Sequence, residues 1–457
     1  MRATAEKTRS GVALVTVLWL MTVLSAVALQ VGLFCRLRLQ LSRNVGEGVS
    51  ALMLARAGVE HALADLKAAR DGIVALDDLR PEGGGLYLNA ELGGGTYTLL
   101  AAPAGQDDGR EYGIRDEAAA VNLNHSDQAV LLRLPGLDAD LAASIVALRD
   151  RMEGIGEIED LLLIEGIDAV LLYGEDRNGN GVLDPCEDDG EATLPPDNAD
   201  ARLETGLAEF LTCRSAVRNV TADGKERVNI NTADAEQLKS ALTNVSEEQA
   251  LSIVEHRKKG EFESIGGLLD VMLVEKEQKR ESEDGGQGGR PQQGPGANEP
   301  QARPQQPNQQ GGGSDGGQSD RTTDEKAFSS EEFVAIADLL TITDDEVLHG
   351  PVNVNTAPPE VLACLPGMDQ SLALAVVDRR RQAPYESVGE LLDLDGLDAE
   401  SFKKLCNLVA VRSDVFSVRS FGVVGGTEGP AAAQCCVHAV IDRTEDGIRL
   451  ASWRELH

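Results

Sequence analysis

The longest apolar run of the chain carries no charged residue between Ser10 and Cys35. About 20 apolar residues in a helix span a bilayer, so this run predicts one membrane-spanning helix. Arg2, Lys7 and Arg9 precede the run, and such a positive bias keeps a short N-terminus in the cytoplasm. The sequence has no second run of this length, so the pattern predicts a single-pass anchor and a large exported body.

The same run also has the features of a secretory leader, because Ala26–Ala28 would suit signal peptidase and leave a mature chain starting at Leu29. The pattern beyond the run argues against removal. Residues 51–66 have apolar side chains at helical spacing: Leu52, Ala55, Val59, Ala62 and Leu66. A cleaved leader normally ends in a break rather than in a continuing helix. We therefore expect the helix to be kept, with a bend at Gly46 and Gly48.

Alternation of apolar and polar residues marks the two ends of the exported part. Residues 84–103 predict a hairpin, and three alternating stretches after residue 412 predict strands. The long middle of the chain follows helical spacing instead. The expected fold class is α+β, with an N-terminal helix, a small antiparallel sheet and a large inserted all-α domain.

This helical middle repeats a pattern that opens with V-N-x-N. The copies begin at Val121, Val228 and Val352. Each continues with a short helix, a turn, an apolar helix ending near an arginine, and a second helical hairpin. Thr232 and Thr356 are of the residue type, and at the position, expected of helix N-caps. The middle of the chain is therefore expected to consist of helix-hairpin-helix-like repeats.

Two hairpin turns, Leu134–Leu137 and Leu365–Met368, resemble the turn that holds a DNA phosphate in helix-hairpin-helix domains. That turn usually has a second glycine, and here Asp138 and Asp369 replace it. A carboxylate would repel a phosphate, and the net charge of −34 also opposes nucleic-acid binding. These repeats are expected to form a protein-interaction scaffold.

Composition narrows the function further. Residues 279–325 are mostly Gly, Gln, Pro, Ser and Asp, which cannot bury enough apolar surface to fold, so a disordered surface insertion is expected. The seven cysteines lack zinc spacing. The sequence has no nucleophile elbow, no H-E-x-x-H and no phosphate loop, and its histidines are isolated. We expect no catalytic residues and no enzyme activity.

The segment "DRNGNGVLDPCE" fits the calcium-loop pattern, in which oxygen ligands recur at fixed positions of a 12-residue loop. The expected ligands are Asp176, Asn178, Asn180, the Val182 carbonyl, Asp184 and Glu187. No clear helices flank the loop, so a structural calcium ion is predicted rather than a sensor.

The order of several motifs resembles the minor pseudopilin K family of the bacterial type II secretion system, also called the general secretion pathway protein K family. The motifs are "KTRSGVALVTVLWLMTVLSAVAL", "ALMLARAGVEHALADL", "GEDRNGNGVLDPCEDDG", "VNVNTAPPEVLACLPG" and "ASWRE". The resemblance implies that prepilin peptidase cuts after Gly11 and methylates the amine of Val12. It also implies an inner-membrane anchor, a cytoplasmic N-terminus and a periplasmic bulk.

The resemblance further implies a place in the assembly. Most pilins and pseudopilins have Glu at mature position five, where it neutralises the N-terminal amine of a neighbouring subunit, and Thr16 stands there in this chain. The K family departs in this way and is thought to cap the pseudopilus tip with minor pseudopilins I and J. The implied partners are these two subunits, prepilin peptidase and the inner-membrane assembly platform.

The expected divisions combine pattern and resemblance. They are a leader at 1–11, a membrane and assembly helix at 12–35, a pilin-like first part at 36–115, an inserted helical domain with the calcium loop at 116–278, the disordered loop at 279–325, the third repeat at 326–411 and the pilin-like C-terminal strands at 412–457. One alternative stays open, because "VNINTADAEQL" also resembles the hairpin domain of a membrane-anchored DNA-uptake receptor of the competence type.

Overall fold

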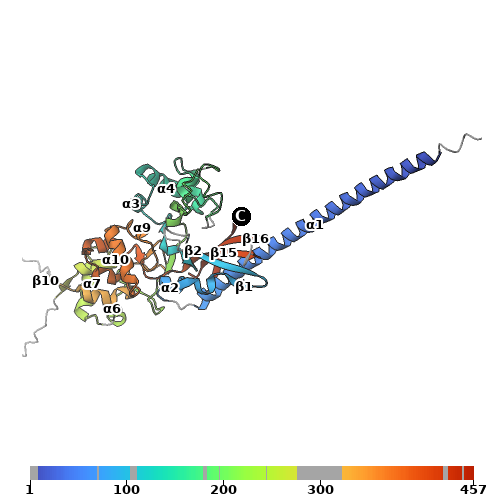
Figure 1. Cartoon of the computed structure of the whole chain (residues 1–457). Coiled ribbons are helices and arrows are strands. Elements are labelled where there is room, and N and C mark those ends of the chain that lie inside the picture. The colour runs from blue at the N-terminus through green and yellow to red at the C-terminus, as the bar shows by residue number, and fades with distance from the viewer. Residues whose placement is uncertain are drawn as a thin grey trace, which may run out of the picture.

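The computed structural model of the chain begins with one long helix that projects from the rest of the molecule (Figure 1). It describes residues 9–68, 72–102, 111–178, 183–194, 196–242, 244–274, 322–425, 431–444 and 447–456. Helix α1, Arg9–Ala68, is 60 residues long and passes through Gly46 and Gly48 without interruption. A helical glycine costs about 1 kcal/mol but keeps the backbone hydrogen bonds that proline would remove. The bend expected at the two glycines is therefore not found.

The C-terminal half of α1 lies on an antiparallel sheet built from both ends of the chain. The order is β1-β2-β15-β16-β17, with β3 paired to β2 and β4 to β15. The bounds are Ala90–Leu92 (β1), Gly95–Ala102 (β2), Glu111–Tyr112 (β3), Arg115–Asp116 (β4), Val415–Val424 (β15), Ala433–Asp442 (β16) and Arg449–Leu456 (β17). The predicted hairpin and the three predicted C-terminal strands are confirmed.

Small residues bring α1 very close to the sheet. Ala55, Val59 and Ala62 are at most 1% exposed, so the predicted apolar face of the helix is the buried one. A Cβ atom at Gly422 of β15 would lie 2.0 Å from the Ala51 carbonyl oxygen of α1. A Cβ atom at Gly58 would lie 2.1 Å from Ser420 Oγ. The contact therefore depends on glycine at both surfaces.

The helical part lies between β4 and β15 and contains three copies of one unit. In each copy a two-residue strand opens the unit, four helical segments common to all three copies follow, and a second short strand pairs in parallel with the first. Copy 1 comprises β5 (Val121–Asn122), α3 (Gln128–Leu131), α4 (Ala139–Met152), η3 (Ile158–Leu163), α5 (Ala169–Tyr173) and β6 (Leu211–Thr212). Copy 2 comprises β8 (Val228–Asn229), α6 (Ala235–Ala241), α7 (Glu247–Arg257), η5 (Ile265–Asp270), α8 (Ser330–Ile336) and β11 (Leu340–Thr341). Copy 3 comprises β13 (Val352–Asn353), α9 (Pro359–Leu362), α10 (Gln370–Arg380), η7 (Val388–Asp393), α11 (Ala399–Leu405) and β14 (Val409–Ala410).

The remaining elements are short. Before and between the copies lie α2 (Leu76–Leu79), η1 (Glu82–Tyr87), η2 (Glu117–Ala119), β7 (Ala216–Arg218) and β12 (Val347–His349). Inside copy 1 lies η4 (Leu207–Phe210), and inside copy 2 lie β9 (Met272–Val274), β10 (Thr322–Lys326) and η6 (Ala337–Leu339). The three copies share one large apolar core, and smaller cores lie between α1 and the sheet. In Figure 1, α3 and α4 of copy 1 lie apart from the group formed by copies 2 and 3.

The position of the low-complexity segment changes the division of the repeats. Strand β11 pairs with β8, so α8 and β11 complete copy 2 rather than open copy 3. The third copy therefore begins at Val352 and not at residue 326. The low-complexity segment interrupts copy 2 between η5 and α8, a position that looks like a domain boundary in the sequence. Residues 275–321 themselves lie outside the described part of the chain.

Candidate functional site

The second asparagine of V-N-x-N ties each copy together. The Asn355 side chain accepts a hydrogen bond from the Tyr385 N–H at 2.8 Å and donates to the carbonyls of Tyr385 (3.0 Å) and Val411 (3.3 Å). Arg380 donates to the carbonyls of Val354 and Ala357. The same side-chain roles fall to Asn124 and Arg149 in copy 1 and to Asn231 and Arg257 in copy 2. The motif therefore builds the scaffold of each copy.

The prediction that Thr232 and Thr356 cap helices is wrong. Asp234 caps α6 by accepting from the Gln237 N–H, and Thr232 lies ahead of that position. Thr356 instead donates its hydroxyl hydrogen bond to buried Asp116 at 2.7 Å. The threonine of copy 3 therefore makes a tertiary contact with the strand that precedes the helical part.

The hairpin turns hold carboxylates where a nucleic-acid phosphate would bind. Asp138 caps α4 by accepting from the N–H groups of Asp140 (3.0 Å) and Leu141 (2.8 Å), and Asp369 caps α10 through the Leu372 N–H (2.8 Å). The donors at a helix N-terminus that could hold an anion are thus engaged within the chain.

The N-terminal half of α1 is exposed and apolar. Val12 is 65% exposed, and Thr16 donates its hydroxyl hydrogen bond back to the carbonyls of Val12 (3.1 Å) and Ala13 (2.9 Å). Gly11 lies within the helix, whereas residues 1–8 of the expected leader lie outside the described part of the chain. Among the described residues, α1 is the one helix long and apolar enough to cross a membrane.

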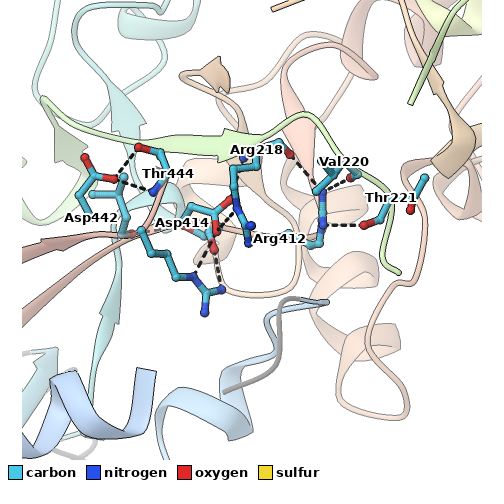
Figure 2. Close-up of polar contacts among 10 residues, drawn as sticks. Arg218, Val220, Thr221, Arg412, Asp414, Asp442 and Thr444 are labelled. Atoms are coloured by element: carbon cyan, nitrogen blue, oxygen red, sulfur yellow. Dashed lines mark hydrogen bonds and ion pairs between the residues drawn. The ribbon is translucent and has the colours of Figure 1, made fainter. Parts of the chain in front are cut away.

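A buried polar network joins the helical part to the start of β15 (Figure 2). Asp414 is 3% exposed and accepts from the Arg218 N–H at 2.7 Å and from Arg443 Nε at 3.1 Å. Arg412 donates to the carbonyls of Arg218, Val220 and Thr221. Burial lowers the pKa of Arg412 to about 10, which leaves it charged at neutral pH. The network fixes the chain where it returns from the helical part to the sheet.

Asp116 fixes the opposite end of the helical part. It is fully buried and accepts from Asn353 (2.8 Å), from Thr356 and from the Ala118 N–H (2.8 Å). Burial raises the pKa of Asp116, while these hydrogen bonds and one from Ser413 oppose the rise. The first asparagine of copy 3 thus contacts the strand that leaves the sheet. Sequence reasoning missed Asp116 and Asp414, because isolated acidic residues carry no motif.

The expected calcium loop is only partly described. The Glu187 carboxylate accepts from the N–H groups of Arg177 (2.9 Å) and Asp184 (3.0 Å), and Asn178 donates to Asp184 at 2.9 Å. Asp176 is also buried, at 6% exposure. Asn180 and Val182 lie outside the described part of the chain. Within the described residues, no three acidic, histidine or cysteine side chains gather as a metal site. The oxygen groups present suit calcium in type, and the site stays a prediction.

A cavity of about 210 Å³ separates copy 1 from the face of the sheet opposite α1. His438 lies in its wall beside Arg115, Arg419 and Arg454, and burial together with these cations lowers the His438 pKa to about 3. The imidazole is therefore neutral at physiological pH. Arg454 of β17 pairs with Glu159 of copy 1 across this space. The first copy is thus held to the sheet by an ion pair beside a neutral histidine.

Comparison with known proteins finds, in the helical part, a match to a general structural motif. Residues 116–173 and 223–279 match the family model of the helix-hairpin-helix motif. Endonuclease/exonuclease/phosphatase family domain-containing protein 1 of Mus musculus is 30% identical over 152 residues, and its Homo sapiens counterpart is 31% identical over 150. Each match covers 33% of this chain and 24% of the relative, so the chain spans about a quarter of the length of these curated relatives.

A more particular match falls on copy 3. Residues 352–412 match the family model of type II secretion system protein K, which supports a K-like relationship over this segment. The segment runs from the opening strand of copy 3 to Arg412 in the buried network. The crystal structure of the GspK-GspI-GspJ complex of the enterotoxigenic Escherichia coli Type 2 Secretion System aligns with 93% of this chain and 99% of that chain, at 13% identity and a TM-score of 0.31.

Proposed function

We propose that the chain is a minor pseudopilin of a type II secretion system, acting at the tip of the pseudopilus in the export of folded proteins. The match of residues 352–412 to the protein K family is the observation that carries this proposal. The architecture supports it, because an exposed apolar half-helix continues into a half that packs on a small sheet. The α1–sheet unit would be the pilin-like part, with the helical copies inserted between β4 and β15.

The N-terminus and the bulk of the insertion support the proposed tip position. Thr16 satisfies its hydroxyl on its own helix and offers no carboxylate to the amine of a neighbouring subunit. An unpaired charge in an apolar filament would cost several kcal/mol. A subunit without that carboxylate needs no subunit ahead of it. Three helical copies beside the sheet would also crowd a filament shaft.

The remaining assignments belong to the same proposal. The chain would act without catalysis, anchored by α1 in the inner membrane with a cytoplasmic N-terminus and a periplasmic bulk. Its partners would be minor pseudopilins I and J, prepilin peptidase and the inner-membrane assembly platform. The curated relatives are named after endonucleases, exonucleases and phosphatases, but the match covers only 24% of each relative and does not bring that activity to this chain.

The N-terminus of the mature chain tests this function. We expect a first residue of Val12 carrying a methylated amine, because prepilin peptidase would cut after Gly11 and retain the helix. Edman sequencing and intact mass of the membrane-extracted chain measure this, with a Gly11→Ala variant expected to keep its leader. A mature chain that begins at Leu29 would contradict the proposal, since signal peptidase would then have removed the assembly helix.

Calcium binding to the 176–187 loop is a separate prediction. We expect calcium to raise the melting temperature of the full chain in detergent, because oxygen ligands would close the loop around the ion. Asp176→Ala should abolish that rise. Asp200→Ala, an exposed acidic residue outside the ligand pattern, serves as control and should keep it. If the Asp176→Ala variant still showed the calcium-dependent rise in melting temperature, the prediction of a calcium site in this loop would be wrong.

The DNA-uptake alternative makes the opposite prediction about duplex DNA. We expect no mobility shift of a 30-base-pair duplex at low salt with the full chain in detergent, because aspartates cap the hairpin helices and the net charge is −34. An Asp138→Gly/Asp369→Gly variant shows whether uncapped turns gain affinity. Tight, salt-sensitive binding by the unaltered chain would favour the uptake receptor.

A further inference from the structure

Three basic side chains form one row across the face of the sheet that lies opposite α1. In the register of β15, β16 and β17, Arg419 stands beside His438, and His438 stands beside Arg454. All three residues line the cavity of about 210 Å³ between the sheet and copy 1. Like charges at neighbouring positions of a sheet destabilise it. The row is therefore unfavourable unless another group compensates its charge.

The two arginines of the row differ in how their charge is compensated. Arg454 donates to Glu159 and, at 2.9 Å, to Glu157 of copy 1. The Arg419 side chain is only 17% exposed, yet it forms no hydrogen bond with the residues that the structure describes. A guanidinium has five N–H donors, and burial of a charged group without acceptors is costly. Arg419 therefore lacks the partners that Arg454 has.

Arg419 shares its one ion pair within the described residues with a second arginine. Glu209 Oε2 lies 3.7 Å from Arg419 Nη2, which is too long for a hydrogen bond. The same carboxylate accepts from Arg115 at 3.0 Å, and Arg115 also donates to the Glu209 carbonyl at 2.8 Å. One carboxylate thus faces two guanidinium groups. Positive charge remains in excess beside Arg419.

His438 is a second unused donor in the same wall. Its imidazole has no hydrogen-bond partner among the described residues. Burial, and then the charges of Arg419, Arg115 and Arg454, lower the His438 pKa to about 3, so the ring is neutral and has one N–H to donate. The charges that act on this ring are all positive. An anion beside His438 would therefore be attracted to this part of the wall.

The acids of the cavity wall do not supply that anion. They are all contributed by the chain between β4 and β15: Glu117, Glu157, Glu159, Asp176 and Glu209. Glu117 accepts from the Thr212 hydroxyl, and Asp176 belongs to the expected calcium loop. The other three are the carboxylates that pair with Arg454 and Arg115. None of the five accepts a hydrogen bond from Arg419 or His438 in the described part of the chain.

We propose that Arg419 and His438 form a binding site for a small oxyanion, a phosphate or a carboxylate, in the cavity between copy 1 and the sheet. The cavity is large enough, because a water molecule in the liquid takes only about 30 Å³. The planar guanidinium matches both kinds of oxyanion and forms strong, charge-assisted hydrogen bonds with them. The anion supplies the acceptor that Arg419 lacks. The site does not depend on the proposed function in secretion.

The melting temperature of the full chain in detergent tests the site. Sodium phosphate and sodium succinate, each at about 10 mM, are compared with sodium chloride at equal ionic strength and pH 7 in calcium-free buffer. We expect at least one of the two oxyanions to raise the melting temperature above its value in chloride, because a ligand of the folded chain stabilises it. A response to phosphate alone identifies a phosphate site, and a response to succinate alone identifies a carboxylate site.

An Arg419→Met variant separates binding from the general stabilisation that phosphate gives to folded proteins. Methionine keeps an unbranched side chain without the charge or the donors. We expect the oxyanion concentration that gives half of the rise to increase at least tenfold in this variant. Arg151→Gln is the matched control, because Arg151 is an exposed arginine of copy 1 outside the cavity wall, and it should keep the full response.

A spectrum of the unaltered chain gives a second measurement that does not depend on how Arg419→Met folds. In a chain labelled with ¹³C at histidine Cε1, the His438 resonance is the one absent from a His438→Leu variant. We expect it to move saturably with the same oxyanion and not with chloride. An unmoved His438 resonance, an unchanged response in Arg419→Met, or a rise in melting temperature that chloride reproduces would each overturn the proposal.

Discussion

Replacing Gly422 with valine should separate α1 from the sheet and destabilise the α1–sheet unit by at least about 3 kcal/mol, at the upper end for overpacking. The substituted Cβ atom would lie 2.0 Å from the Ala51 carbonyl oxygen and 2.5 Å from the Ala55 N–H nitrogen, both backbone atoms of α1. Backbone atoms cannot turn aside as a flexible side chain can, so the whole helix must shift. The shift would expose the side chains that α1 now buries.

Trp453 reports this contact directly. It packs with Ala55 and Val59 of α1 and lies 5.5 Å from the Arg56 guanidinium. Trp19 is the only other tryptophan of the sequence, and a Trp19→Phe background removes it. The fluorescence of Trp453 during urea unfolding of the full chain in detergent then gives the free energy of unfolding. Gly46→Val is the matched control, because nothing lies within 4 Å of a Cβ atom at that position of the same helix. Equal stability of the two variants would contradict the close packing.

Removing the Asp414 carboxylate should cost about 3–5 kcal/mol, because it leaves the buried Arg443 without its partner. Both side chains are almost fully buried, at 5% and 7% exposure, and Arg443 Nε lies 3.1 Å from Asp414 Oδ1. Asp414→Ala would also leave the Arg218 N–H without its acceptor. We expect a lower midpoint in urea and earlier proteolysis at the boundary between the helical part and β15.

Asp442→Ala is the control for that experiment, since Asp442 is also visible in Figure 2 and pairs with a half-exposed arginine, Arg449. The Arg449 side chain is 56% exposed, and ion pairs with exposed partners contribute about 0–1 kcal/mol. The other hydrogen bonds to Asp442 come from Thr444, two residues along, so the loss should be smaller than for Asp414→Ala. A loss for Asp414→Ala no greater than for Asp442→Ala would mean that the return of the chain to the sheet does not depend on this network.

The elements that sequence could predict are those specified by local periodicity. The apolar face of α1, the hairpin near residue 90 and the C-terminal strands each follow from local spacing, and the repeats follow from the recurrence of V-N-x-N at Val121, Val228 and Val352. The capping roles of Asp138 and Asp369 were not predicted, although they are local, because the sequence identified these residues only as carboxylates that would repel a phosphate. Their backbone partners lie two or three residues further along the chain.

The contacts that sequence could not predict join distant segments. Asp116 meets Asn353 and Thr356 only after the helical part has folded, and the same holds for Asp414 with Arg218. Thr356 has the local features of a cap, but its tertiary partner prevails. The extent of copy 2 could not be predicted, because the low-complexity segment looks like the end of a unit. In the structure, the parallel pairing of β8 and β11 joins the parts of copy 2 on either side of that segment.

The placement of the helical part has a consequence for the order of folding. Leu100 of β2 pairs with Arg419 of β15, so this sheet contact closes a loop that contains the whole helical part. Closure of so long a loop carries an entropic cost that grows with its length. Asp116 pairs with Phe416, however, so a folded helical part already brings the two strands together. The folded helical copies would then hold β4 and β15 close together before the rest of the sheet forms. Substitutions in the copies that slow their folding should therefore also delay formation of the sheet.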